Sequence, residues 1–429
     1  MIGEREAVDK LAAVVPANVR QVCATLTDGG HEAVTVGGAV RDALLGREPG
    51  DWDVATSARP EQVLAMFPRC IPTGLQHGTV TIVTGRGEAS HVEVTTFRGE
   101  GAYSDGRRPD EVHFGVPLVD DLARRDLVVN AMAYDPARRV LHDPFGGLAD
   151  LQARRLRAVG PSPDPFANAV GRFTEDGLRV MRAVRFAAVL EFDLDPQTER
   201  GIGQPSVLAS LAKVSRERVS DELRKLLAAP SPSRGLVPAV ATGIVASILP
   251  AVAAALGDAD LGAWARVVDA ASAESRLAAL LSPLASAAPG LDVATQRRVE
   301  ELLRALKFSV AEATAASRLV ALARCTAADA PALRRALRDG GRALGGAAVS
   351  LWRALGNGAL ADRAADILER RDPIAAAELA VAGKDVIDQL AIPAGPRVGQ
   401  LLKALFERVL DDPALNTREA LLALAQTLP

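Results

Sequence analysis

The stretch AVTVGGAVRDALLGREPGDWD, residues 33–53, decides the fold of the N-terminal part of this chain. Its first residues, Ala33–Val36, form a β-branched run typical of a strand, and the run ends at Gly37 and Gly38, where a helix is expected to begin. Glycines at such a turn let a phosphate approach the backbone, and Arg41 can reach the same phosphate from the first helical turn. A plain strand-to-helix turn is the commoner meaning of this pattern, so by itself it leaves both interpretations open.

Two aspartates, Asp51 and Asp53, close the same stretch. Side chains alternate along a strand, so both carboxylates are expected on one face, where they can hold the same magnesium ions. A third carboxylate, Glu93, follows on another predicted strand, His91–Thr96. Three strand-borne carboxylates beside a phosphate loop are what two-metal nucleotidyl transfer requires. We therefore expect Asp51, Asp53 and Glu93 to be catalytic, with Mg²⁺ as the cofactor and the two aspartates as its ligands.

A basic strip is expected on a later helix. Asp176, Arg179, Arg182 and Arg185 recur at every third position, so they share a slowly drifting face. An aspartate accepts from an exocyclic amine and an arginine donates to a ring nitrogen, a combination that cytosine and adenine both satisfy and that uracil and guanine do not. A solvated helix face with ion pairs from Glu175 and Asp176 to Arg179 is the alternative.

The rest of the chain changes from strand-forming to helix-forming sequence along its length. A third short β-branched run lies at Thr79–Val83, and the strand signal fades after Gly160. We expect an α+β head with a mixed sheet, followed by an all-α extension. The expected domains are a catalytic head at 1–155, a base-reading helical neck at 156–230, a helical body at 231–345 and a helical, RNA-binding tail at 346–429.

The bulk numbers fit a folded protein of several domains. The chain has 429 residues, is 48% hydrophobic, and carries a formal charge of −3, so any nucleic-acid partner depends on local basic patches. Three scattered cysteines indicate a reducing compartment, and the N-terminus lacks the layout of a signal peptide. The apolar stretch 236–256 is broken by glycine and proline and is expected to form buried helices. We expect a cytoplasmic protein with no membrane partner.

The motifs together resemble a known family. The matching segments, in order, are Gly37-Gly38, Asp51-Trp52-Asp53, Gly74-Leu75-Gln76-His77-Gly78-Thr79, Glu93-Val94-Thr95-Thr96-Phe97-Arg98, Arg124-Arg125-Asp126 with Asn130-Ala131, Asp143-Pro144-Phe145-Gly146-Gly147, and Glu175-Asp176 through Arg179, Arg182, Arg185 and Phe186. The first two resemble the nucleotidyltransferase superfamily that includes DNA polymerase β. The whole series, over residues 33–227, resembles the class II tRNA nucleotidyltransferase and bacterial poly(A) polymerase family.

The resemblance implies roles for individual residues. Gly38 and Arg41 would contact the nucleotide phosphates, and Arg125, beside Asp126, would bind the triphosphate. Asp176 and Arg179 would select the base of CTP or ATP, with Arg182 and Arg185 completing the basic helix. Segment Ser215–Arg218, with Glu222 and Lys225, would support that helix. Gly177 departs from the family, which usually has proline there.

Two further segments carry expectations. The loop Tyr103–Pro109 holds Asp105, Arg107 and Arg108, and the resemblance implies a flexible loop that helps to add the final adenosine; a plain solvated loop is the alternative. In the C-terminal part, Lys384 and a Gly-Pro turn with Gly395 and Arg397 resemble the family's tail, where a helix start would bind an RNA phosphate; a simple turn is equally open. All five histidines lie at or before His142, so no His/Asp phosphohydrolase domain is expected.

The resulting expectation is template-independent addition of C and A to the 3′ end of tRNA, using CTP and ATP and releasing pyrophosphate. Related alternatives are a tRNA nucleotidyltransferase that adds only A and a poly(A) polymerase. A catalytically silent RNA-binding protein is a fourth possibility, against which the mutually repelling carboxylates Asp51, Asp53 and Glu93 count.

Overall fold

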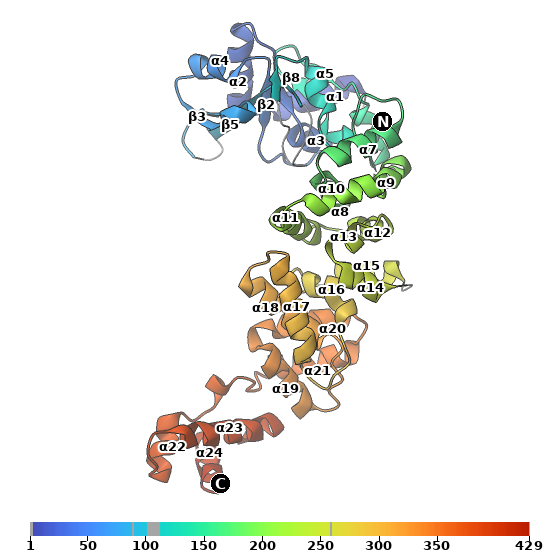
Figure 1. The fold of residues 1–429 in the computed structure, drawn as a ribbon. Helices are drawn as coiled ribbons and strands as arrows, with labels where there is room; N and C mark the ends of the chain where they lie inside the picture. Colours follow the sequence, from blue (N-terminus) through green and yellow to red (C-terminus); the bar gives the residue numbers. More distant parts are fainter. Residues whose placement is uncertain (1–2, 88–89, 101–111, 258–259, 429) are drawn as a thin grey trace. The chain divides into compact units, whose positions relative to one another are not determined.

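The computed structural model describes residues 3–87, 90–100, 112–257 and 260–428 (Figure 1). Contacts divide the chain into two units, Met1–Ile248 and Leu249–Pro429. The expected α+β head followed by an all-α extension is confirmed, since the large sheet lies wholly within the first unit. The finer division into four domains stays a prediction.

The first unit contains a seven-stranded sheet with the order β3-β4-β5-β2-β1-β8-β9. Its strands are β1 (Ala33–Val36), β2 (Asp53–Thr56), β3 (Cys70–Gly74), β4 (Thr79–Val83), β5 (His91–Thr96), β8 (Ala133–Asp135) and β9 (Val140–His142). The three strands expected from β-branched runs are confirmed with the bounds given above. Every neighbouring pair is antiparallel except β2 with β5, which run parallel.

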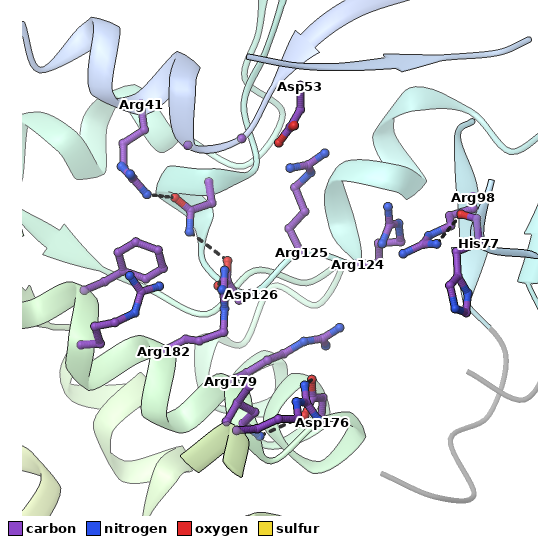
Figure 2. A pocket seen from close by; sticks show the side chains of 17 residues that line it. Arg41, Asp53, His77, Arg98, Arg124, Arg125, Asp126, Asp176, Arg179 and Arg182 are labelled. Atoms are coloured by element: carbon purple, nitrogen blue, oxygen red, sulfur yellow. Dashed lines mark hydrogen bonds and ion pairs between the residues drawn. The ribbon is translucent and has the colours of Figure 1, made fainter. Parts of the chain in front are cut away.

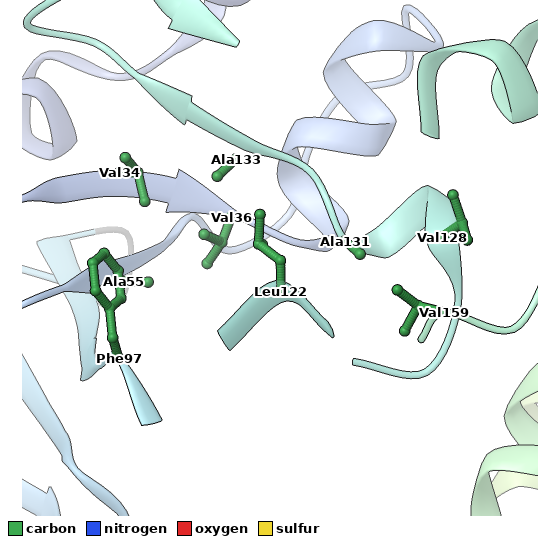
Figure 3. Close-up of a cluster of buried hydrophobic side chains, with 9 residues drawn as sticks. All are labelled: Val34, Val36, Ala55, Phe97, Leu122, Val128, Ala131, Ala133 and Val159. Carbon is green, nitrogen blue, oxygen red and sulfur yellow. The ribbon is translucent and has the colours of Figure 1, made fainter. Parts of the chain in front are cut away.

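Register decides which side chains share a face of this sheet. Val34 lies opposite Ala55, and Val36 lies opposite both Asp53 and Ala133. Val34, Val36, Ala55 and Ala133 belong to one buried cluster, together with Phe97, Leu122, Val128, Ala131 and Val159. Figure 3 shows Leu122 pointing from its helix toward Val36. Because Asp53 alternates in phase with Ala55, its side chain lies on the same face as this cluster.

Helices and two small sheets complete the head. The helices are α1 (Glu4–Val14), α2 (Ala17–Asp28), α3 (Gly38–Leu44), α4 (Pro60–Met66), α5 (Leu118–Ala123) and α6 (Gly147–Ala153), with the 3-10 turns η1 (Leu75–His77) and η3 (Val128–Asn130). The small sheets pair β6 (Arg98–Glu100) with β7 (Val112–Phe114), and β10 (Arg155–Leu156) with β11 (Asp193–Leu194). Leu122 of α5 is fully buried, so truncating it to alanine would cost about 2–5 kcal/mol.

The first unit ends in a helical layer. Its helices are α7 (Pro165–Glu175), α8 (Leu178–Leu190), α9 (Pro196–Ile202), α10 (Pro205–Lys213), α11 (Arg216–Leu227), α12 (Ser233–Ala241) and α13 (Ile244–Ile248). Asp164 caps α7 by accepting from Phe166 N, and Pro165 occupies the first helical position, which suits its missing N–H. The expected fading of strands after Gly160 is confirmed, since β11 is the only strand in the described residues beyond that point.

The second unit is helical throughout its described residues, apart from one isolated bridge between Ala288 and Cys325. Its helices are α14 (Pro250–Leu256), α15 (Leu261–Ala270), α16 (Arg276–Leu281), α17 (Val293–Ala305), α18 (Val310–Leu322), α19 (Ala330–Gly340), α20 (Gly345–Ala354), α21 (Gly358–Glu369), α22 (Gly383–Leu390), α23 (Pro396–Asp411) and α24 (Arg418–Ala425), with η4 (Ser282–Leu284), η5 (Arg342–Leu344), η6 (Ala376–Glu378) and η7 (Pro413–Leu415). In the part of the chain that the structure describes, no helix is both long and apolar enough to cross a membrane.

A buried ion pair holds α19 within the second unit. Arg334 donates through Nε to Asp372 at 2.7 Å and through Nη1 to the carbonyl oxygen of Leu410 in α23 at 2.9 Å. Both side chains are almost fully buried. A buried charge is costly unless it is paired, so this contact specifies one packing of α19 against α23.

Candidate active site

The turn after β1 has a conformation and a neighbour that both require glycine. Gly37 has φ of 77°, a left-handed backbone value that favours glycine. A Cβ atom there would lie only 2.7 Å from Nη1 of Arg125. The guanidinium of Arg125 therefore packs against the bare glycine backbone, at the point where the sequence predicts a phosphate loop.

Three carboxylates converge beside this turn. In the parallel β2–β5 pair Val54 lies opposite Val94, which places Asp53 and Glu93 at the same end and on the same face. Asp51 precedes β2, so the expectation that Asp51 lies on a strand is wrong. Asp51 and Asp53 are both exposed, with buried Trp52 between them. Although Asp53 keeps exposed surface, the protein around it displaces water and Glu93 repels its charge; together they raise the pKa of Asp53 from the usual 3.8 to about 6, with Asp51 adding to the rise and Arg125 opposing it.

A divalent cation would relieve the repulsion between Asp53 and its acidic neighbours. Carboxylates that repel one another gain most when a hard cation binds between them. No group of three or more His, Cys, Asp or Glu side chains is arranged to hold a metal by itself in residues 3–87, 90–100, 112–257 and 260–428. Two carboxylates with substrate phosphates suffice for magnesium, which usually keeps several waters. Asp51 and Asp53 therefore fit a metal that arrives with its nucleotide.

A cavity of about 650 Å³ opens next to Asp53 (Figure 2). Eight arginines and three aspartates are among its lining residues. The lining is Gly37, Gly38, Arg41, Asp53, His77, Arg98, Arg124, Arg125, Asp126, Asn130, Asp176, Leu178, Arg179, Arg182, Arg185, Phe186 and Arg218. The cavity thus brings together Gly38, Asp53 and all the residues expected to bind nucleotide. Asp51 and Glu93 lie outside its lining.

Asp176 and Arg179, the pair expected to read the base, line one wall of the cavity. Asp176 follows the last residue of α7 in an extended conformation and lies two residues before α8 begins at Leu178, so the expectation that Asp176 shares one helix with Arg179 is wrong. Its Oδ1 accepts from Leu178 N at 3.0 Å. Oδ2 of Asp176 accepts from Arg218 at 3.1 Å. Segment Ser215–Arg218, which was expected to play a supporting role, therefore contacts Asp176. Arg179 donates to Glu175 at 2.9 Å, which is one of the ion pairs that the solvated-face alternative required. Both side chains nevertheless face the cavity.

Two of the residues expected to bind nucleotide are engaged within the protein. Arg41 is buried and donates to Asn130 Oδ1 at 2.5 Å and to both oxygens of Asp42 at 2.9 Å. Asp126 accepts from Arg182 at 2.8 Å and from Asn130 at 2.9 Å. Burial works against the charge on Asp126, but Arg182, Asn130 and the backbone N–H of Leu127 hold the pKa of Asp126 well below its usual range. Asp126 thus fixes Arg182 in place.

Three arginines, two of them from α8, surround the aromatic ring of Phe186. The guanidinium carbons of Arg41, Arg182 and Arg185 lie 4.9, 5.5 and 4.1 Å from the centre of the Phe186 ring. Arg185 also pairs with Glu222 of α11 at 2.6 Å. Cation–π contacts of this kind orient arginines, so packing against Phe186 helps to hold these three guanidinium groups in place.

Several residues gained importance only in the structure. His77, Arg98 and Arg124 belong to the motifs that carry the family resemblance, but the sequence assigned them no role. Asp121 belongs to none of these motifs. Asp121 is 1% exposed and pairs with Arg124 at 2.9 Å and Arg125 at 3.5 Å. The available signal in the sequence was an acidic residue on a short helix, followed by arginines three and four positions later.

Other expected site residues lie elsewhere. Asp105, Arg107 and Arg108 fall outside the described residues. Lys384 lies near the start of α22, and Gly395 and Arg397 flank the start of α23; all three are exposed in the second unit. Their position at helix starts agrees with the expectation of an RNA contact, which stays a prediction.

Fold and site together define a nucleotidyltransferase: a mixed sheet that carries repelling carboxylates at the mouth of an arginine-lined cavity. Sequence models of three families match this chain: the poly A polymerase head domain over residues 33–157, an RNA and SrmB binding site of polymerase A over 191–256, and the tRNA nucleotidyltransferase domain 2 over 291–425.

Individual relatives agree along nearly the whole length. A CCA-adding enzyme of Geobacillus stearothermophilus is 40% identical over 93% of each chain. The crystal structure of the Bacillus stearothermophilus CCA-adding enzyme in complex with CTP is similar with a TM-score of 0.70 and 33% identity, covering 96% of this chain and 98% of that one. The Thermotoga maritima CCA-adding enzyme complexed with tRNA shares the fold, with a TM-score of 0.65 at 18% identity over 98% of both chains. The chain belongs to the CCA-adding enzyme family of tRNA nucleotidyltransferases.

Proposed function

We propose that this protein adds C and A nucleotides to the 3′ end of tRNA without a nucleic-acid template, using CTP and ATP and releasing pyrophosphate. One observation carries the proposal: a single cavity has Asp53 at one side and the Asp176–Arg179 wall at another. The same space can therefore hold a triphosphate at the acidic edge and its base at the helical wall. The enzymatic activity follows the family, and the converging carboxylates Asp51, Asp53 and Glu93 argue against a silent RNA-binding protein.

Magnesium would be held by Asp51 and Asp53, with Glu93 as the supporting carboxylate. Enzymes of this family generally use a divalent metal, and the raised pKa of Asp53 supports a cation at this place. When bound, the metal would favour the ionised form of the attacking 3′-hydroxyl and neutralise charge on the leaving pyrophosphate. The protein's own part would be to hold Asp53 and Glu93 on one face of β2 and β5, with Asp51 just before β2.

Base selection would come from Asp176 and Arg179. Each carboxylate oxygen has room for a second donor, so Asp176 can accept from an exocyclic amine while Arg218 stays bound. Arg179 is held by Glu175 and by the carbonyl oxygen of Arg172 at 3.1 Å, which orients its remaining N–H groups. Cytosine and adenine present the matching amine and ring nitrogen, whereas uracil and guanine do not.

The triphosphate would lie against Gly38, Arg125, Arg182 and Arg185. Arginine forks suit phosphate oxygens and keep their charge at any working pH. Arg41 and Asp126 would act behind this surface, since their polar atoms already bind protein partners. In the second unit, exposed Lys384, Gly395 and Arg397 would contact the tRNA body. The three free cysteines agree with a reducing cytoplasm as the place of action.

The test gives purified protein three tRNA substrates, which end before CCA, after C and after CC. Each receives Mg²⁺ with CTP, ATP or both, and the products are sized on a gel. Completion to CCA from every start is the expected result. Addition of one A to the CC-ending tRNA alone would show an A-only enzyme, and long A ladders on many RNAs would show a poly(A) polymerase. Asp53→Ala should abolish all products while tRNA binding is kept.

A further inference from the structure

One part of the cavity serves neither the base nor the triphosphate in this account. His77, Arg98 and Arg124 line it, and Figure 2 shows them away from Arg179 and Arg182, beyond Arg125. His77 ends η1, Arg98 begins β6, and Arg124 follows α5, so three separate segments supply this group. We refer to these three residues as the outer basic group.

A buried carboxylate organises the outer basic group. Oδ1 of Asp121 accepts from Nε of Arg124 at 3.0 Å and from the backbone N–H of Arg98 at 3.3 Å. Arg98 donates in turn to the carbonyl oxygen of His77. Oδ2 of Asp121 faces Nη2 of Arg125 at 3.5 Å. Since burying a carboxylate is costly unless cations compensate it, this arrangement fixes where Arg124 and Arg125 point.

Nucleotidyl transfer brings two substrates to Asp53. In an in-line displacement the attacking 3′-hydroxyl lies opposite the leaving pyrophosphate, so the RNA end and the triphosphate occupy different sides of the metal site. In the proposed function, the triphosphate side is made up of Gly38, Arg125, Arg182 and Arg185. Every nucleotide of the RNA end brings a phosphate, which requires a cationic partner when it enters the cavity. The outer basic group supplies basic side chains of the cavity lining to which the proposed function gives no role.

We propose that Arg98 and Arg124, together with His77, bind the backbone phosphate of the terminal RNA nucleotide. Asp121 positions the two consecutive arginines for two substrates: Arg125 for the incoming triphosphate and Arg124 for the RNA. The inference rests on the proposed function, and it extends that function to how the RNA 3′ end is held. These phosphate contacts position the 3′-hydroxyl and carry no sequence information.

Steady-state kinetics separates the two sides. Arg98→Gln and Arg124→Gln should each raise the KM for CC-ending tRNA about tenfold, the loss of one charge-assisted hydrogen bond, and leave the KM for ATP within about twofold. The slope of log affinity against log salt should fall by about one per variant. Arg138→Gln removes an equally cationic side chain from an exposed position in the same unit and should change neither KM. A raised KM for ATP with an unchanged KM for tRNA would overturn the inference.

A modified substrate tests the contact itself, first with the wild-type protein and then with one variant. A methylphosphonate at the last internucleotide linkage removes one charge, and it should lower kcat/KM of the wild-type protein about tenfold. Arg124→Gln should be nearly insensitive to the same change, because the partner is already gone. Equal losses in both proteins, or no loss in the wild type, would refute the phosphate site. Absence of any CCA addition by the wild type would instead remove the proposed function.

Discussion

At Asp53, the chain keeps a carboxylate whose own neighbours oppose its charge. Surrounding protein and Glu93 raise the pKa of Asp53 to about 6, and Arg125 offsets this only in part. The ionised carboxylate of Asp53 destabilises the folded protein but favours cation binding, because a metal ion would provide the positive charge that its neighbours do not. This opposition between neighbouring carboxylates is what the proposed metal site would require, if the metal binds together with the nucleotide.

The stability of the metal-free protein should report this opposition. Because the pKa of Asp53 is near 3.8 unfolded and about 6 folded, ionising Asp53 disfavours the folded state. Asp53→Asn should therefore melt higher than the wild type without divalent metal. The difference should grow between about pH 4 and about pH 6 and stay constant above that. Added Mg²⁺ should stabilise only the wild type. Melting curves that run parallel across this pH range would contradict the raised pKa.

At the scale of single residues, the sequence indicated which residues belong to the candidate site more readily than which side chains they contact. Asp53 and Glu93 were found because alternation and strand order constrain carboxylates on a sheet. Arg41 and Asp126 were expected to touch the nucleotide, yet their polar atoms bind Asn130, Asp42 and Arg182. Asp121 was missed because nothing local in the chain says that its carboxylate is buried. Burial and long-range pairing are properties of the packed fold.

At the scale of elements, the junction of α7 and α8 decides where the base-reading wall lies. Gly177 has an ordinary helical φ of −60°, which proline also tolerates. A Cβ atom there would nevertheless lie 2.3 Å from Leu211 N and 2.4 Å from the Ser210 carbonyl carbon, both backbone atoms of α10. The family's usual proline would therefore not fit this packing. Close contact with α10 sets the entry of α8 here.

Gly177→Ala should consequently push α8 away from α10. We expect an overpacking cost of about 1–3 kcal/mol in the free energy of unfolding, together with weaker discrimination between CTP and UTP. Gly171→Ala is the matched control on α7, because nothing lies within 4 Å of its added Cβ. It should be neutral or stabilise by up to about 1 kcal/mol. Denaturant unfolding of both variants provides the comparison, and equal effects would refute the steric argument.

The elements themselves were partly predictable. β1, β4 and β5 were recognised from short β-branched runs bounded by glycine or polar residues. The sheet order and the single parallel pair, β2 with β5, were not, because register depends on contacts between distant segments. That parallel pair is the feature that brings Asp53 level with Glu93.

At the scale of the whole molecule, the proposed chemistry and the proposed contacts with the tRNA body fall in separate units. All residues of the arginine-lined cavity lie within Met1–Ile248, whereas Lys384, Gly395 and Arg397 lie within Leu249–Pro429. The loss of strand signals after Gly160 predicted a helical second unit, but its internal packing depends on contacts between distant helices that no local pattern specifies. A lesion in one unit should therefore leave the binding function of the other.

Asp372→Asn tests this separation. It leaves the buried charge of Arg334 without its carboxylate, so the second unit should lose about 3 kcal/mol or more of stability. We expect weaker tRNA binding and unchanged CTP binding, measured by titration. Asp362→Asn breaks an exposed pair with Arg353, in which the side chains are 59% and 71% exposed, and should cost under about 1 kcal/mol. A parallel loss of CTP binding in Asp372→Asn would contradict independent units.

The most direct measurement of the central claim, that a protein wall selects the bases, is the sequence of the added 3′ ends. A tRNA lacking CCA is incubated with Mg²⁺ and all four nucleoside triphosphates at equal concentration, and the product ends are sequenced. The wild type and Arg234→Ala, which alters an exposed pair outside the cavity, should yield CCA and stop. Arg179→Ala should incorporate U or G about 10- to 100-fold more often. Continued exclusion of U and G by Arg179→Ala would contradict selection by this wall.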